Sequence, residues 1–214
     1  MFVCQGIARA KSVKQDKKTP TLTDDIRAMV DTLDNRLIGI RDRAMLLLGF
    51  AGAMRRSELA ALNVEDVEIK PQGLFVTIQR SKTDQLGEGQ VIGIPYGSTY
   101  ETCPVRSMQA WLEASGITEG ALFRSIDRHG NIKGRIPDDV VARVVKKCAE
   151  AAELDASKYA GHSLRAGLAT SGALAGATLE DIMRQTRHKS ERVARGYVRV
   201  ADVFKNNVAA RVGL

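Results

Sequence analysis

Two of the three histidines in the chain stand near arginines in patterns that favour contact with an anion. His162 follows Gly161 at the predicted start of a helix, and Arg165 comes three residues later. Residues at this spacing share one face of a helix, and the amino-terminal end of a helix favours negative charge. His162 and Arg165 could therefore meet the same small anion. A capping histidine with an unrelated surface arginine would give the same pattern.

The second of these histidines, His188, lies nine residues before Tyr197, in a segment with five basic residues between positions 187 and 199. Ser190 is a candidate N-cap between them, so His188 would precede a helix that carries the tyrosine. A tyrosine on such a helix can be a half-buried packing residue. Its basic surroundings favour a different role.

Three more basic residues lie where predicted elements begin or end. Arg55 and Arg56 stand between two apolar helices, where burial is costly for an arginine unless it meets an anion. Either side chain could instead extend into water. Lys82 follows a predicted strand, where a lysine is commonly a solvated edge charge.

Apolar periodicity predicts the helices that would position these residues. The first begins after Thr23, the predicted N-cap, and another runs between Pro104 and Gly116, residues that commonly stand at the two ends of a helix. Further helices are predicted at 39–53, from near 57, and at 138–152, 163–174, 178–186, 190–199 and 202–212.

Early in the chain the pattern changes to that of short strands. Val67–Ile69, Leu74–Gln79 and Gln90–Ile94 are alternating or β-branched, and glycine-containing turns at 71–73 and 87–89 separate them. We therefore expect a mainly α domain with one small antiparallel β-sheet, an α+β fold.

The composition is that of a globular protein: 214 residues, 44% hydrophobic and 27% charged. A chain of this length can bury enough surface to fold without a disulfide or a metal. The net charge of +7 lies mainly in residues 1–20 and 184–205. Such charge is compatible with a polyanion partner and equally with an ordinary basic surface.

Cysteine usage and hydropathy indicate the compartment. Cys4, Cys103 and Cys148 are far apart and form no Cys-x-x-Cys pair, which predicts neither a disulfide framework nor a zinc site. Cys148 is expected in the core. The longest apolar stretch, 44–54, is shorter than the about 20 residues that span a bilayer. We expect a soluble, cytoplasmic protein with no membrane contact, no cofactor and no metal.

Taken together, these segments resemble the tyrosine recombinase (phage integrase) family. The matching elements are Gly-x-x-Arg-x-Ser-Glu-Leu, Ser-Lys-Thr, His-x-Leu-Arg, His and Tyr, in that order, and the intervals between them match as well. They stand at Gly52–Leu59, Ser81–Thr83, His162–Arg165, His188 and Tyr197. The resemblance covers residues 20–200 and implies the catalytic-domain fold of that family.

The resemblance implies that three residues move protons or form bonds. Tyr197 would attack the scissile phosphodiester and hold the 3′-phosphate as a phosphotyrosine. His162 would assist proton transfer at the tyrosine, and Lys82 would protonate the leaving 5′-oxygen. The phosphotyrosyl bond conserves the energy of the cut strand, so rejoining would need no ATP.

The other matching residues would bind phosphate. Arg55 and Arg165 would contact the non-bridging oxygens, which suit planar guanidinium groups, and His188 would donate to a phosphate oxygen. Further DNA contacts are expected from four basic residues: Arg56, Arg80, Arg187 and Lys189. Where the family commonly has Leu-Gly-His, this chain has Thr186-Arg187-His188. Arg187 would add a DNA contact or only reshape the turn.

The implied function is site-specific recombination of double-stranded DNA, integration or excision, by a homo-tetramer on DNA whose free form could be a monomer. Residues 1–20 would be a basic interdomain linker or remnant, 21–200 the catalytic domain, and 201–214 an amphipathic tail. The tail would dock on a neighbouring protomer or on its own domain.

Three other functions are compatible with parts of the pattern. A type IB topoisomerase uses similar residues to relax supercoils, but the compact motif strings favour the recombinase. A catalytically inactive DNA-binding relative would need neither Tyr197 nor Lys82. A helical adaptor between proteins would not place six such residues in family order.

Overall fold

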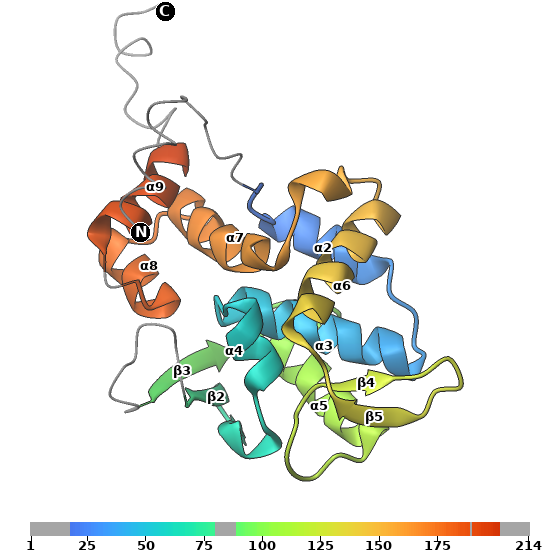
Figure 1. The fold of residues 1–214 in the computed structure, drawn as a ribbon. Coiled ribbons are helices and arrows are strands. Elements are labelled where there is room, and N and C mark those ends of the chain that lie inside the picture. Colours follow the sequence, from blue (N-terminus) through green and yellow to red (C-terminus); the bar gives the residue numbers. More distant parts are fainter. Residues whose placement is uncertain (1–17, 80–88, 189, 202–214) are drawn as a thin grey trace, which may run out of the picture.

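The computed structural model describes residues 18–79, 89–188 and 190–201, which form a mainly helical chain with two small antiparallel sheets (Figure 1). The expected α+β fold is confirmed. The helices are α2 (Thr23–Asp31), α3 (Leu37–Ala51), α4 (Arg56–Ala61), α5 (Pro104–Ser115), α6 (Asp138–Ala151), α7 (Gly161–Leu174), α8 (Leu179–Thr186) and α9 (Glu191–Ala201). Two short 3-10 turns lie at Val64–Asp66 and Ala156–Lys158. The predicted helix at 202–212 lies outside the described residues.

Helix α3 forms the centre of the core. Its sequence is apolar apart from Arg41-Asp42-Arg43, and α2, α4, α5, α6 and α7 all pack against it. A helix that is apolar on every side must be covered on every side, which explains why the other helices surround it. The turn after α3 carries Ala53, a buried residue with φ of 45°, and leads directly into α4.

The first sheet has the order β1-β2-β3, with strands at Val67–Lys70, Gly73–Ile78 and Gln90–Pro95. All three predicted strands are confirmed. The inward residues alternate with more exposed ones and are buried in the main core, as in an antiparallel sheet with one face exposed to solvent. Gly73, with φ of 145°, lies so close to β3 that a Cβ there would come within 2.1 Å of the Ile94 carbonyl oxygen.

A second sheet, β4 (Arg124–Ile126) and β5 (Ile132–Arg135), was not predicted. Its strands are only three and four residues long and lie largely at the surface, so they lack the alternation that reveals a strand in sequence. The turn between them is held by Asp127, which accepts hydrogen bonds from the backbone N–H groups of His129 and Asn131.

Most predicted helix ends agree with the structure, with one correction. Gly116 ends α5 in the left-handed conformation, with φ of 63°. The prediction that Thr23 caps α2 is wrong by one position, because the N-cap is Leu22. A leucine can occupy this position because the Asp25 carboxylate, three residues on, accepts from its backbone N–H at 2.9 Å.

The last three helices, α7, α8 and α9, pack on one another at one side of the core. Helix α9 packs against α7 and α8, and Tyr197 and Val198 contact a small apolar cluster formed by Ala169, Ala173 and Ile182. This contact fixes the face that α9 presents to α7. Within the part of the chain that the structure describes, no helix is both long and apolar enough to cross a bilayer.

Candidate active site

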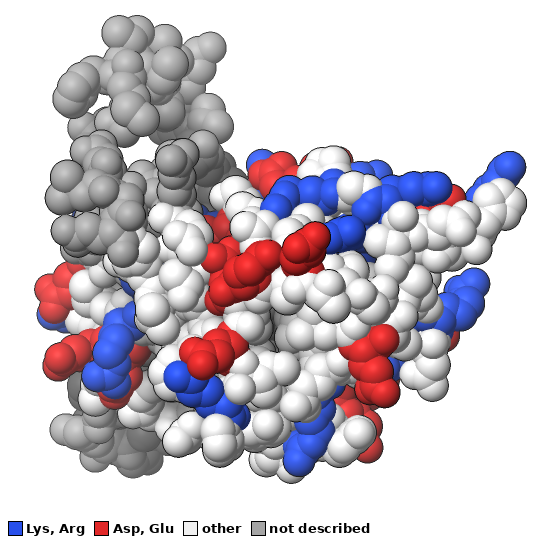
Figure 2. Space-filling model, turned by 90° about the horizontal axis from the view of Figure 1, so that it is seen from below, with Lys and Arg blue, Asp and Glu red and all other residues white. Residues whose placement is uncertain are grey.

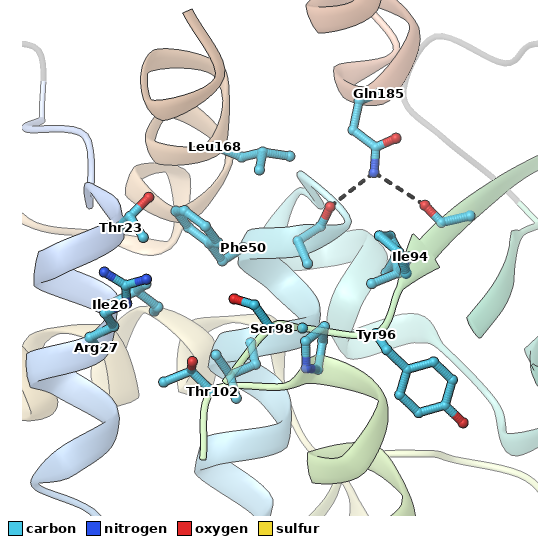
Figure 3. Close-up of a pocket in the computed structure, with 16 residues that line it drawn as sticks. Thr23, Ile26, Arg27, Phe50, Ile94, Tyr96, Ser98, Thr102, Leu168 and Gln185 are labelled. Carbon is cyan, nitrogen blue, oxygen red and sulfur yellow. Dashed lines mark hydrogen bonds between the residues drawn. The ribbon is translucent and has the colours of Figure 1, made fainter. Parts of the chain in front are cut away.

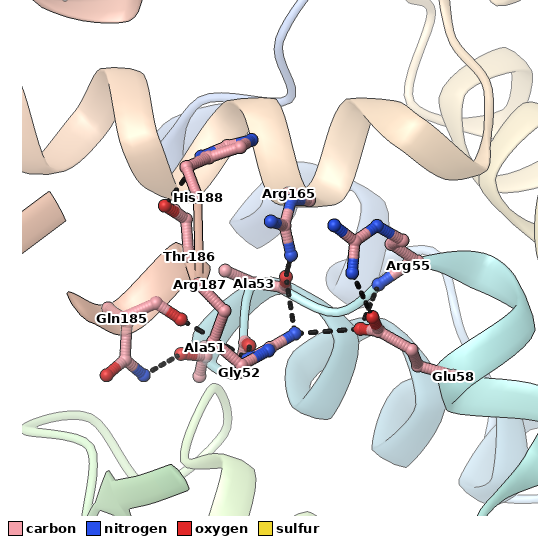
Figure 4. A network of polar contacts seen from close by, with 10 residues as sticks. All are labelled: Ala51, Gly52, Ala53, Arg55, Glu58, Arg165, Gln185, Thr186, Arg187 and His188. Carbon is pink, nitrogen blue, oxygen red and sulfur yellow. Dashed lines mark hydrogen bonds and ion pairs between the residues drawn. The ribbon is translucent and has the colours of Figure 1, made fainter. Parts of the chain in front are cut away.

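Five of the six predicted catalytic residues are described; four stand at or near the end of a helix, and Tyr197 lies within α9. Arg55 is the N-cap residue of α4, and His162 and Arg165 lie in the first turns of α7. His188 follows the end of α8, and Tyr197 lies on α9. Arg55, Arg165 and His188 lie beside the turn that follows α3 (Figure 4).

A buried carboxylate, Glu58, lies between two of the arginines. It accepts a hydrogen bond from the Arg55 backbone N–H at 2.9 Å, forms an ion pair with the Arg55 side chain, and forms a second ion pair with Arg187 at 2.7 Å (Figure 4). Burial alone would raise the pKa of Glu58, but the N–H bond and the two guanidinium charges outweigh it and lower the pKa. Glu58 is therefore a carboxylate at neutral pH.

Arg165 is the most deeply buried of the cationic groups, with 1% of its surface exposed. Its Nη1 donates to the Ala53 carbonyl oxygen at 2.8 Å. Within the described part of the chain, its buried Nη2 has no hydrogen-bond partner. Burial and the charges of Arg55 and Arg187 lower the pKa of Arg165 to about 10, so it remains protonated at neutral pH. A buried, charged donor without a partner is costly and suits an incoming anion.

His188 has a defined tautomer. The Thr186 hydroxyl donates its one hydrogen to the Ile182 carbonyl oxygen at 2.6 Å. The Thr186 hydroxyl oxygen lies 2.7 Å from Nδ1 of His188 and has no second hydrogen to give, so the imidazole donates to it and we assign the hydrogen to Nδ1. Burial, followed by the charges of Arg165 and Arg55, lowers the pKa of His188 to about 4. In the free chain Nε2 is thus an unprotonated acceptor.

Tyr197 and His162 complete the cluster. Burial raises the pKa of Tyr197, and the charge of Arg165 opposes that shift only in part, so the phenol is neutral in the free chain. Desolvation, with the charges of Arg165 and Arg55, lowers the pKa of His162 although the residue as a whole is exposed. Both side chains therefore lie within reach of the charge of Arg165.

Among the residues expected to contact DNA, Arg56 has an exposed side chain that pairs with Asp138 at 3.0 Å, outside the cluster. Lys82, Arg80 and Lys189 lie outside the described residues. Arg187, for which a DNA contact or a reshaped turn was predicted, differs from Arg56 in its surroundings. Its side chain is 5% exposed, it pairs with Glu58, and it donates to the Gly52 carbonyl oxygen at 3.0 Å, so it faces the protein interior.

Sequence reasoning assigned no role to three groups of this site. Glu58 stands in the quoted Ser-Glu-Leu string, so its position was visible, but its two arginine partners were not. The Ala53 carbonyl accepts from both Arg165 and Arg187, and Thr186 fixes the His188 tautomer. Backbone acceptors of this kind leave no mark in the residue types of a sequence.

One groove of the surface contains none of the candidate residues. A mostly apolar groove of about 370 Å³ lies between α2, α3, β3 and α7, where Gln185 donates to the Ala51 carbonyl oxygen at 2.9 Å (Figure 3). On the face shown in Figure 2, acidic and basic side chains are interspersed, so its described part is not uniformly basic. Among the described residues, no three histidine, cysteine or acidic side chains are grouped as metal ligands.

Comparison with known proteins gives one family. The sequence pattern of the phage integrase family matches residues 21–203. An integrase/recombinase XerD homolog of Selenomonas ruminantium is 42% identical over 209 residues, which cover 97% of this chain and 61% of that protein. The tyrosine recombinase XerD of Staphylococcus aureus is 28% identical over 193 residues, 89% of this chain and 61% of that protein.

Solved structures share the fold. The XerH site-specific recombinase in a post-cleavage complex with a palindromic difH substrate has a TM-score of 0.71 at 14% identity, over 90% of this chain and 53% of that chain. The XerA recombinase has a TM-score of 0.66 at 16% identity, over 93% and 63%. The chain spans about three-fifths of the length of the curated relatives named above. Since the family pattern covers most of its length, the chain belongs to the phage integrase family.

Proposed function

We propose that the protein cuts and rejoins DNA strands at specific sites through a covalent 3′-phosphotyrosyl bond to Tyr197. The observation that carries this proposal is the unpartnered Nη2 of Arg165, a buried cationic donor beside Arg55 and Tyr197. A phosphodiester oxygen would supply the missing acceptor. Two guanidinium groups aimed at one phosphate stabilise the charge that develops in the transition state.

The reaction would proceed by transesterification. The Tyr197 oxygen forms a bond to phosphorus while the bond from phosphorus to the 5′-oxygen breaks. The phenol proton passes to His162, and Lys82 supplies a proton to the leaving 5′-oxygen. Bound phosphate places negative charge beside His188, which favours protonation of Nε2 and allows that nitrogen to donate to a phosphate oxygen. The negative charge on the phosphate oxygens is thus stabilised by cationic side chains.

The substrate is proposed to be double-stranded DNA carrying a recombination site. This proposal draws on the relatives, which are named as tyrosine recombinases, and on the XerH structure, which is described as bound to a difH substrate. We propose a homo-tetramer on DNA that is a monomer when free, acting in the cytoplasm. Residues 1–20 would link to a preceding DNA-binding domain, and residues 201–214 would dock on a neighbouring protomer.

The test is an assay of the full-length protein on plasmids that carry candidate sites from its own genetic element. A recombinase yields a denaturant-resistant protein–DNA band and recombinant products that require two sites. Relaxation of supercoils without recombinants would assign the topoisomerase activity instead. Specific binding of DNA with neither product would assign an inactive DNA-binding relative.

A further inference from the structure

We propose that Arg187 is a positioning residue for strand cleavage, which joins the turn before His188 to the turn before Arg55 and shares Glu58 with Arg55. This inference rests on the proposed function. It replaces the direct DNA contact predicted from the sequence.

The contacts of Arg187 connect two distant parts of the chain. From the end of α8, Nη1 donates to the Gly52 carbonyl oxygen at 3.0 Å, and Nη2 donates to the Ala53 carbonyl oxygen at 3.3 Å and to Glu58 Oε2 at 2.7 Å (Figure 4). Both terminal nitrogens therefore have protein partners. With its side chain 5% exposed, Arg187 is poorly placed to contact DNA.

The backbone at both ends of this link is unusual. Arg187 has φ of 56° and Ala53 has φ of 45°, both in the left-handed region that favours glycine. Such conformations persist when surrounding contacts impose them, and they concentrate at functional sites. The Arg187 side chain links the two turns. Its own backbone forms the turn after α8, and its guanidinium group donates to carbonyl oxygens in the turn after α3.

Electrostatics explains how the link would affect the reaction. Glu58 offers Oε1 to Arg55 and Oε2 to Arg187, so its charge is divided between two guanidinium groups. Without Arg187, the buried carboxylate would be left with Arg55 alone and would hold that side chain back from phosphate. The Ala53 carbonyl would also lose one of its two donors, and that carbonyl orients Arg165.

The experiment compares Arg187→Gly with the wild type in single-turnover covalent attachment of the full-length protein to nicked site DNA. Glycine suits the left-handed backbone, so the variant removes the guanidinium group without adding strain. We expect attachment at saturating DNA to slow about 10- to 100-fold, with the half-saturating DNA concentration unchanged. Millimolar guanidinium chloride should restore part of the rate. Arg184→Ala is the matched control, since Arg184 is an exposed arginine of the same helix paired with Asp181.

Each outcome decides the question. A normal rate for Arg187→Gly at saturating DNA, or a loss confined to DNA affinity, would overturn the proposal. If the glycine variant does not fold, Arg187→Lys replaces it, because lysine keeps the charge but cannot reach two carbonyls and a carboxylate together. A wild-type rate for the lysine variant would then overturn the proposal, and a slow rate would support it. If the wild type itself fails to attach, the proposed function fails, whatever Arg187 does.

Discussion

The imidazole of His188 lies against the phenol of Tyr197, with ring centroids 5.8 Å apart and ring planes at 33°. The two residues are nine positions apart, and the left-handed turn at Arg187 together with the start of α9 brings their tilted rings side by side. Arg165 acts on the pKa of both. In the free chain the pair consists of a neutral imidazole and a neutral phenol, so a bound phosphate would change the charge of the site.

Replacement of the phenol tests the nucleophile. Tyr197→Phe keeps the aromatic ring that packs on Ala169, Ala173 and Ile182 but removes the oxygen that would attack phosphorus. We expect loss of covalent attachment with DNA affinity nearly unchanged, measured on denaturing gels and by binding titration. A phenylalanine variant that still attaches to DNA would show that another residue is the nucleophile.

A change of leaving group tests whether Lys82 is the general acid. Lys82→Ala should slow cleavage at a normal 5′-oxygen by about 10²- to 10⁴-fold, the contribution typical of general acid catalysis. A substrate with a 5′-sulfur in that position needs no protonation, so the variant should cleave it at close to the wild-type rate. The ratio of the two rates is the measurement. Equal losses on both substrates would contradict the assignment of Lys82 as the acid.

The sequence was sufficient for the parts of the fold that follow a regular period. Helix α5, for example, runs between the predicted Pro104 and Gly116, and the strands of the first sheet lie where alternation placed them. The β4–β5 sheet was missed because its few residues are only partly buried, so no alternation was imposed on them. The N-cap of α2 was placed one residue too late. Leu22 has no capping side chain, but its backbone N–H donates to the carboxylate of Asp25, the third residue of the helix.

The site was predictable in its residue types but not in its internal pairings. Motif order identified Arg55, His162, Arg165, His188 and Tyr197, and the fold brings all five to one place. The burial of Arg187 could not be foreseen. An arginine in a basic segment is ordinarily exposed, and only the three-dimensional approach of the α8 end to Glu58 turns it inward.

Helix α7 packs against the chain before α2 so closely that one glycine is required. A Cβ on Gly167 would lie 1.9 Å from the Thr21 carbonyl oxygen. The Thr21 backbone is itself held to α7, because its N–H donates to the Ser163 carbonyl oxygen at 3.0 Å. Backbone cannot yield as a side chain can, so Gly167→Ala should lower the free energy of unfolding by about 3 kcal/mol or more. Urea unfolding of the variant and the wild type measures this difference in the free energy of unfolding.

Gly172 on the same helix is the matched control. A Cβ there would meet Ala177 and Ile182 at 3.8 Å, which is ordinary contact. Gly172→Ala should therefore raise the free energy of unfolding by about 0.5–1 kcal/mol, because alanine favours a helix interior over glycine. Equal effects at the two positions would contradict the close approach of α7 to Thr21.

The His188 pKa predicts how stability depends on pH. In the unfolded chain a histidine titrates near pH 6.5, and in the folded chain His188 titrates at about 4. Between these values the unfolded state binds a proton that the folded state does not, so the free energy of unfolding falls as the pH decreases from about 6.5 toward 4. The contribution of His188 to stability is fully present above that window.

Thermal unfolding at a series of pH values measures this slope. His188→Gln should flatten it, and a residual slope should remain because the pKa of His162 is lowered as well. His129→Gln is the control for loss of a histidine outside the site, since His129 lies exposed in the turn between β4 and β5. If His188→Gln and wild type lose stability in parallel between those pH values, the imidazole is not held neutral by burial and the neighbouring guanidinium groups.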